Sequence, residues 1–475
     1  MSIYMKNILV RAAASPFEPR GAGYAIKNDA IWGNTGNLLF PHSVCKLLMT
    51  EDDTVVATIR TGRGKPYTAG EIAAINEKYD MFVIPLANAF RENFAEFGSL
   101  TPMVEALKIP CVVVGAGLQA PVNAKTTDHY PFDGDVKRFV KAVLDKSAML
   151  GLRGEMTADY LARLGFRAEK DFTVIGCPSM YLYGGALPEP GKKPLTEESM
   201  VCMNLTSGSP EYFFRFIEKC RRELPNHYLI PQGLHDLNLL YAGVPIPGKV
   251  RAALKAYYPF TASHELLVQN RVRMFTDVPS WLAFLGGAQF SFGRNIHGNI
   301  AAVLAGAPAF VFAPDARVLE LAEYHSIPHM LMQDITPETD IREIYEKTDF
   351  HTAHRAHAQR FGHFSAFLRA NGIEHVYEEH RRYDGFPFDK KLAEIPFPGP
   401  VESLYGRDAI EQAARLEFGY AHAERRVTQA KAKEAALQEE IARLEQEAGT
   451  INPVKIAMRW LRNVLKRVRK WRKTK

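Results

Sequence analysis

The sequence lacks the features that mark secreted, zinc-binding and membrane-spanning proteins. Only five of its 475 residues are cysteine, and none forms a Cys-x-x-Cys pair. Such sparse cysteines are typical of reduced thiols in a cytosolic protein and argue against a disulfide framework or a zinc site. The opening stretch MSIYMKNILVRAAA has no long apolar core, so we expect no signal peptide. No apolar run approaches the roughly 18–20 residues of a membrane span.

Metal ligands are also scarce. Asp128, His129 and Asp133 lie close together, but in a stretch that reads as a loop, where such side chains are usually solvated. We therefore expect no metal site and no resident cofactor.

Positive charge is concentrated at the C-terminal end. The formal net charge is +6, but the last 21 residues, from Lys455 to Lys475, contain ten Lys or Arg and no acid. Without them the chain would carry −4, so the globular part is mildly acidic. In residues 452–475 apolar side chains, two of them Trp, fall on one helical face and basic ones on the other. This pattern predicts a helix lying on an anionic membrane surface, and the tryptophans favour it over a nucleic-acid-binding tail or a solvated basic end.

Strand-like and helix-like segments alternate along the first two-thirds of the chain. Residues 6–13, 80–86 and 110–117 are apolar on both faces, as a parallel sheet covered by helices requires. Helical patterns such as 70–79 and 155–165 separate them. The alternation stops at a Gly/Pro/Lys-rich stretch and then restarts. This predicts an α/β fold with two Rossmann-like lobes and a ligand site at the strand ends.

Composition divides the chain into successive segments, which are 1–185 (first lobe), 186–199 (linker), 200–376 (second lobe), 377–406 (irregular connector), 407–447 (long helix) and 452–475 (basic amphipathic helix). Within 407–447, apolar residues follow 3-4 spacing, broken only by Glu434. The sequence leaves two interpretations open: a coiled coil through which the chain forms a homo-oligomer, or a long helix packed on its own protein.

Two polar side chains stand at the end of a strand-like run in SFGRNIHGNIAAVLAGAPAF, residues 291–310. Arg294 and His297 follow the run and precede a helical pattern. Free backbone N–H groups at a helix start favour an anion, and a guanidinium adds a bidentate clamp. Arg317 follows the next strand-like run in the same way. Because the carboxyl ends of parallel strands meet at one edge, these residues predict an anion site with a histidine able to transfer a proton.

The first half of the chain offers a counterpart in GLRGEMTADYLARLG. Arg153 lies there at a strand-to-helix turn, with Thr157 in the first helical turn. Two glycine turns accompany it: WGNTGN at Trp32–Asn37 and GAGLQ at Gly115–Gln119.

These motifs together resemble the polysaccharide pyruvyl transferase family. The resemblance covers residues 5–375 in organisation, and its specific motifs lie in 151–180 and 291–328. It implies a fold similar to the two-lobed GT-B glycosyltransferases, with the first lobe on the acceptor side and the second on the donor side. It implies transfer of the enolpyruvyl unit of phosphoenolpyruvate onto two hydroxyls of a sugar, giving a cyclic pyruvate ketal.

The resemblance also implies roles for single residues. Arg153, Arg294 and Arg317 would bind the donor, and His297 would be the general acid. Arg317 stands where the family commonly has Lys, which keeps the charge but changes the geometry. Asn34 and Asn37 in the first glycine turn would contact the acceptor, although the family usually has Asp at the position of Asn37.

The partners expected from this interpretation are phosphoenolpyruvate as co-substrate, a sugar or lipid-linked glycan acceptor, and an anionic membrane surface, with no nucleic acid. The expected location is the cytoplasm, at the inner face of the plasma membrane. Two other functions stay open. A GT-B glycosyltransferase using a nucleotide sugar would need an acidic residue for the ribose and a base-stacking pocket, and the sequence places neither. A non-enzymatic membrane-associated scaffold would not need Arg153, Arg294 and His297.

Overall fold

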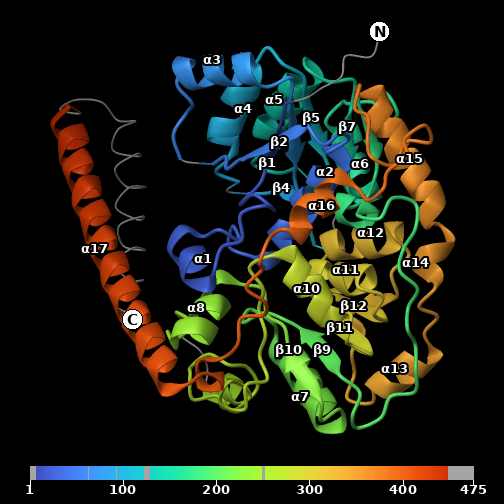
Figure 1. Cartoon of the computed structure of the whole chain (residues 1–475). Coiled ribbons are helices and arrows are strands. Elements are labelled where there is room, and N and C mark those ends of the chain that lie inside the picture. The colour runs from blue at the N-terminus through green and yellow to red at the C-terminus, as the bar shows by residue number, and fades with distance from the viewer. Residues whose placement is uncertain (1–6, 63, 93, 122–128, 249–251, 448–475) are drawn as a thin grey trace. The chain divides into compact units, whose positions relative to one another are not determined.

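The computed structural model describes residues 7–62, 64–92, 94–121, 129–248 and 252–447 (Figure 1). The chain divides into two compact units, one made of Met1–Leu234 and Arg273–Val401, the other of His235–Val272 and Glu402–Lys475. The first unit contains two parallel sheets, which define a first and a second lobe. The predicted lobe boundaries remain predictions, and the predicted membrane helix at 452–475 lies outside the described residues.

The first lobe is built on a parallel sheet with the strand order β2-β1-β3-β5. Strands β3 and β5 are buried on both faces, as their uninterrupted apolar sequences require. The strands are β1 (Asn7–Arg11), β2 (Val55–Ile59), β3 (Met81–Pro85) and β5 (Cys111–Val114). The helices around them are α1 (Ala22–Asn28), α3 (Ala69–Lys78), α4 (Phe97–Ala106), α5 (Asp133–Leu144) and α6 (Glu155–Arg163). The order places a topological switch point between β1 and β3.

Two short parallel pairs extend this lobe: β4 (Asn88–Phe90) with β6 (Gly117–Leu118), and β7 (Leu150–Leu152) with β8 (Phe172–Val174). The backbone N–H groups of Gly115 and Ala116 donate to the carbonyl of Gly151, at 2.9 and 3.1 Å. This joins the end of β5 to β7 and brings the turn between β7 and α6 to the same edge.

A buried helix crosses the first lobe. The 3₁₀ turn η1 (Thr35–Leu38) leads into α2 (Leu39–Leu48), and every residue of α2 is buried. A second 3₁₀ turn, η2 (Pro178–Tyr181), packs against α2. Because none of its residues is exposed, α2 forms part of the core.

The second lobe is a five-stranded parallel sheet with the order β10-β9-β11-β12-β13. Its strands are β9 (Val201–Asn204), β10 (His227–Leu229), β11 (Phe290–Gly293), β12 (Ala309–Ala313) and β13 (His329–Leu331). Its helices are α7 (Glu211–Glu223), α10 (Val278–Leu285), α11 (Ile296–Leu304), α12 (Ala316–Tyr324) and α13 (Ile341–Lys347), with the 3₁₀ turn η4 (Met332–Asp334). The chain reverses its direction across the sheet between β9 and β11, so the predicted anion site lies at this switch point.

After the second sheet the chain returns to the first. Helices α14 (Thr352–Arg355) and α15 (His357–Ala370) follow α13, and α15 runs beside the first lobe (Figure 1). The side-chain carbonyl of Asn371 accepts the backbone N–H of Ala148 at 3.0 Å, which fixes the end of α15 to the first lobe. The predicted irregular connector contains a short helix, α16 (Pro387–Ala393).

The second unit contains most of α8 (Leu234–Ala242), with η3 (Ala252–Ala256), α9 (Glu265–Val268), η5 (Leu404–Gly406) and the long helix α17 (Ala409–Glu447). The predicted long helix is therefore present. Along its apolar seam Tyr420 is 69% exposed and Val427 is 37% exposed, whereas Ile441 is buried. Oligomerisation through this helix stays a prediction. None of the described helices is long and apolar enough to cross a bilayer.

Candidate active site

The turn between β11 and α11 is locked to the end of β9. The backbone N–H of Arg294 donates to the carbonyl of Asn204 at 3.0 Å, and the N–H of Asn295 donates to the side-chain oxygen of Asn204 at 2.8 Å. The amide of Asn204 in turn donates to Asn299 at 3.0 Å. These buried hydrogen bonds fix the start of α11 at the switch point, so Arg294 and His297 are held on a rigid frame.

Gly293 makes this close approach possible. Its φ of +147° is a backbone conformation that favours glycine, and a Cβ at this position would lie 1.9 Å from the carbonyl oxygen of Asn204. Gly293→Ala should therefore lower the free energy of unfolding by about 3 kcal/mol or more, from backbone strain and overpacking together. Thermal unfolding measures this, with Gly134→Ala as the control because no atom lies within 4 Å of a Cβ there. Equal melting temperatures for both variants would contradict the assigned geometry.

Arg153 reaches the site from the first lobe. It follows β7 and is only 1% exposed. Its Nε donates to the carbonyl of Gly115 at 2.7 Å, and one terminal nitrogen donates to the carbonyl of Leu86 at 3.3 Å. These carbonyls follow β5 and β3, so two strand ends of the first sheet hold the guanidinium. Its other terminal nitrogen lies 3.5 Å from Nε2 of His297 in the second lobe.

Within the described chain, Arg153 contacts no carboxylate. Burial lowers its pKa; the interactions with Cys177 and Glu320 raise it, and that with Arg317 lowers it. A buried cation without a paired anion costs several kcal/mol, and proteins keep such groups mainly where function requires them. The arrangement indicates a receptor for an anionic ligand.

His297 lies in a pocket of first-lobe side chains. Its Nε2 is 3.7 Å from Sγ of Cys177, its ring centroid is 5.8 Å from that of Phe40, and a Cβ at Gly36 would lie 2.9 Å from its own Cβ. Burial, followed by the charges of Arg153 and Arg317, lowers the pKa of His297 well below its usual range. The imidazole is therefore neutral at neutral pH in the ligand-free protein.

Arg294 and Arg317 complete the cationic group. Arg294 donates to Oγ of Ser209 at 3.2 Å, and burial lowers its pKa, with Asp315 acting in the opposite direction. Arg317, at the start of α12, makes a 3.4 Å contact with Asp315, and its buried Nε has no partner in the described structure. Electrostatic interactions link Arg317 to Arg294, Arg153 and His297. The structure thus brings together the four residues that the sequence pointed to.

Sequence reasoning missed two residues of this site. Cys177 follows β8 beside His297, and Glu320 lies one turn beyond Arg317 on α12, where it is 6% exposed. A glutamate inside an amphipathic helix normally faces solvent, so the sequence carried no signal for Glu320. Cys177 lies in the resembling stretch TVIGCPSM, which could have drawn attention to it.

Asn34 and Asn37 shape the turn that packs beside His297. The side-chain oxygen of Asn34 accepts the N–H of Gly36 at 2.8 Å and caps η1, and the side-chain amide of Asn37 donates to the carbonyl of Trp32 at 2.9 Å. Both side chains are half-buried. Their predicted contact with an acceptor stays a prediction.

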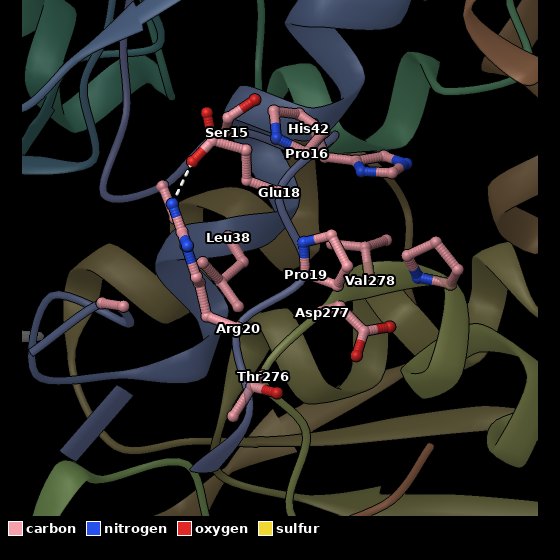
Figure 2. Close-up of a pocket in the computed structure, with 13 residues that line it drawn as sticks. Ser15, Pro16, Glu18, Pro19, Arg20, Leu38, His42, Thr276, Asp277 and Val278 are labelled. Atoms are coloured by element: carbon pink, nitrogen blue, oxygen red, sulfur yellow. Dashed lines mark hydrogen bonds and ion pairs between the residues drawn. The ribbon is translucent and has the colours of Figure 1, made fainter. Parts of the chain in front are cut away.

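A small cavity of about 30 Å³ lies against another face of the same segment (Figure 2). Leu38 and His42, one helical turn apart, line it, whereas Phe40 between them contacts His297. Burial, with a smaller contribution from Lys46, lowers the pKa of His42 to about 3, so this imidazole is neutral. The guanidinium of Arg20 at the cavity pairs with Glu18, as Figure 2 shows. The carboxyl of Asp277 and the hydroxyls of Ser15 and Thr276 also line the cavity, so its polar groups are not those of a phosphate receptor.

Comparisons with known proteins give one family match and several distant structural similarities. The model of the polysaccharide pyruvyl transferase family matches residues 34–316. No curated protein matches the sequence. Among solved structures, the UDP-GlcNAc 2-epimerase of Neisseria meningitidis, bound to UDP-GlcNAc, is 10% identical, with 77% of this chain and 100% of that chain covered and a TM-score of 0.40. A putative UDP-N-acetylglucosamine 2-epimerase of Listeria monocytogenes is 12% identical, with 78% and 98% covered and a TM-score of 0.40. An uncharacterized protein of Klebsiella pneumoniae is 12% identical, with 67% and 88% covered and a TM-score of 0.34.

The structural similarities are distant and say nothing about activity. The family match is more specific, since it spans more than half of the 475 residues. It includes Arg153, Arg294 and His297 and ends one residue before Arg317. The chain therefore belongs to the polysaccharide pyruvyl transferase family, as its motifs predict.

Proposed function

We propose that this protein transfers the enolpyruvyl unit of phosphoenolpyruvate onto two hydroxyls of a sugar, in a cell-envelope or exopolysaccharide precursor, and forms a pyruvate ketal. The observation that carries the proposal is the buried guanidinium of Arg153, which contacts His297 and no carboxylate among the described residues. Phosphoenolpyruvate bears a phosphate and a carboxylate. Three arginines can bind both groups and stabilise the departing phosphate.

The reaction begins with a proton transfer from His297 to the methylene carbon C3, which leaves an oxocarbenium-like centre at C2. One sugar hydroxyl attacks C2, and its proton returns to the now neutral imidazole. The C2–O bond to phosphate breaks, the second hydroxyl closes the ketal, and its proton leaves with the phosphate. The donor itself brings the negative charge that offsets Arg153 and Arg317, so its binding raises the pKa of His297 toward the range in which it acts as an acid.

The acceptor is assigned to the side of the first lobe. The turn with Asn34 and Asn37 packs beside His297, and amide side chains can both donate hydrogen bonds to sugar hydroxyls and accept them. The basic segment 452–475 supports an acceptor that is lipid-linked at the cytoplasmic membrane face. The enzyme would then be peripheral at that face, and the helix at 407–447 would be the site of any self-association.

Calorimetric binding of phosphoenolpyruvate tests the proposal. The wild type should bind it, and Arg294→Ala should weaken binding by about 10- to 100-fold, because hydrogen bonds to charged groups contribute about 1.5–3 kcal/mol. Arg138→Ala is the matched control, since Arg138 is an exposed arginine that pairs with Glu105 on the surface. Binding of a nucleotide sugar with no response to phosphoenolpyruvate would overturn the proposal in favour of glycosyl transfer.

A further inference from the structure

We propose that Glu320 is a positioning residue that couples donor binding to the uptake of a proton, because its carboxyl is held on Thr157 where it interacts with both Arg153 and Arg317. The proposal rests on the proposed function for the identity of the donor. It concerns the charge balance of the site and not the transfer step itself.

The geometry fixes the carboxyl of Glu320 between the two lobes. Glu320 projects from α12, and Oε1 accepts the hydroxyl of Thr157 at 2.9 Å, while Oε2 accepts the backbone N–H of Thr157 at 3.2 Å. Thr157 lies in the first turn of α6, the helix that follows Arg153. A Cβ at Gly154 would lie 2.6 Å from Oε2, so the carboxyl fills the space that this glycine leaves. Glu320 thereby ties the element that carries Arg317 to the element that carries Arg153.

The carboxyl interacts with both arginines but forms an ion pair with neither in the described chain. The charges of Arg153 and Arg317 each act on Glu320, after the hydrogen bonds from Thr157. The other titratable groups around it are Glu155 on α6, Glu323 and Tyr324 on α12, and Arg360 on α15. Phosphate or carboxylate oxygens that bind to Arg153 and Arg317 would compete with the Glu320 carboxylate for interaction with these two positive charges.

Glu320 also lines a cavity. The cavity has a volume of about 440 Å³, and Glu155 and Glu323, which are exposed, line it as well. Through this cavity the carboxyl of Glu320 can exchange protons with solvent.

The direction of the coupling follows from the charges. Burial raises the pKa of Glu320 to about 7, against the hydrogen bonds from Thr157 and the two arginines. At neutral pH the group is therefore partly ionised in the free protein. A bound anion offsets the arginines and adds negative charge, which raises this pKa further. The protein must then take up a proton on binding.

Calorimetry in buffers of different ionisation enthalpy counts these protons, with phosphoenolpyruvate and with inorganic phosphate as probes. At pH 7 the wild type should take up more protons than Glu320→Gln, by about half a proton, because a group with a pKa near 7 is half ionised there. Glu323→Gln is the matched control on the next turn of the same helix, and it should match the wild type. Equal proton counts for the wild type and Glu320→Gln overturn the proposal.

Thr157→Val is a second variant that keeps the proposal testable if Glu320→Gln does not fold. It removes the hydroxyl that donates to the carboxylate and that thereby lowers the pKa of Glu320. Without this hydroxyl the pH at which proton uptake is largest should move upward. An unchanged pH of maximal uptake overturns the proposal. Binding of phosphate without phosphoenolpyruvate would overturn the proposed function, while the proton count with phosphate would still test Glu320. Failure of both anions to bind the wild type would overturn both.

Discussion

Arg153→Met should lower kcat/KM for phosphoenolpyruvate by about 100- to 1,000-fold, the usual cost of removing one preorganised donor to a developing anion. Methionine keeps most of the side-chain volume but no charge. Fold stability should change little, because two opposing effects are of similar size. The carbonyls of Gly115 and Leu86 lose their donor, at about 1–3 kcal/mol each. In return, a buried cation without a carboxylate partner is removed.

The same substitution has a spectroscopic consequence. Burial lowers the pKa of His297 most, and of the two neighbouring charges Arg153 lowers it more than Arg317 does. In Arg153→Met the His297 resonance should therefore titrate at a higher pH than in the wild type. Arg163→Met is the control at the last residue of α6, where the arginine pairs with Asp133 at 3.0 Å. A large loss of stability with unchanged donor affinity would assign Arg153 a structural role and contradict the site.

The cationic part of the site could be predicted because the carboxyl ends of the strands in a parallel sheet lie side by side at one edge. Arg294 and Arg317 follow adjacent strands, β11 and β12, and pairing those strands is enough to bring them near each other. Arg153 was harder to place, since its strand lies in the other lobe and its closeness to His297 depends on how α6 and α12 meet. The family resemblance supplied that link where strand order alone could not.

The rest of the site could not be read from the sequence for a physical reason. Glu320 and Phe40 are interior positions of helices, and a helix pattern shows which residues share a face but not what that face meets. Helix α2 is not among the helices that the sequence predicts, and its burial could not be predicted because polar residues such as His42 and Lys46 are buried there among apolar ones. The pattern marked the strands well, since runs such as β3 and β5 are apolar on both faces.

His297→Asn should leave donor binding within a few-fold of the wild type but reduce transfer by about 100- to 10,000-fold, the range expected for loss of a general acid. In the free protein the imidazole is neutral at neutral pH, so it has to gain a proton when the donor binds before it can act as an acid. In the wild type kcat/KM should therefore rise as the pH falls, and His297→Asn should lose this rise. Steady-state rates and calorimetric binding, measured on both proteins across pH, separate the acid role from a contribution to affinity.

Glu320, whose pKa burial raises to about 7, also contributes to the pH dependence, so the two groups have to be distinguished. In a Glu320→Gln background the remaining pH dependence of kcat/KM belongs to His297, and it should vanish when His297→Asn is added.

The free energy of unfolding gives an independent test of the neutral imidazole. Because the folded protein holds His297 neutral, the wild type should lose stability as the pH falls below about 6.5, where the histidine of the unfolded chain gains a proton. The His297→Asn variant should lose less stability over the same pH range. If His297→Asn still transferred the enolpyruvyl unit at the wild-type rate, another group would have to donate the proton to C3. Cys177, 3.7 Å from Nε2 of His297, is then the next side chain to replace.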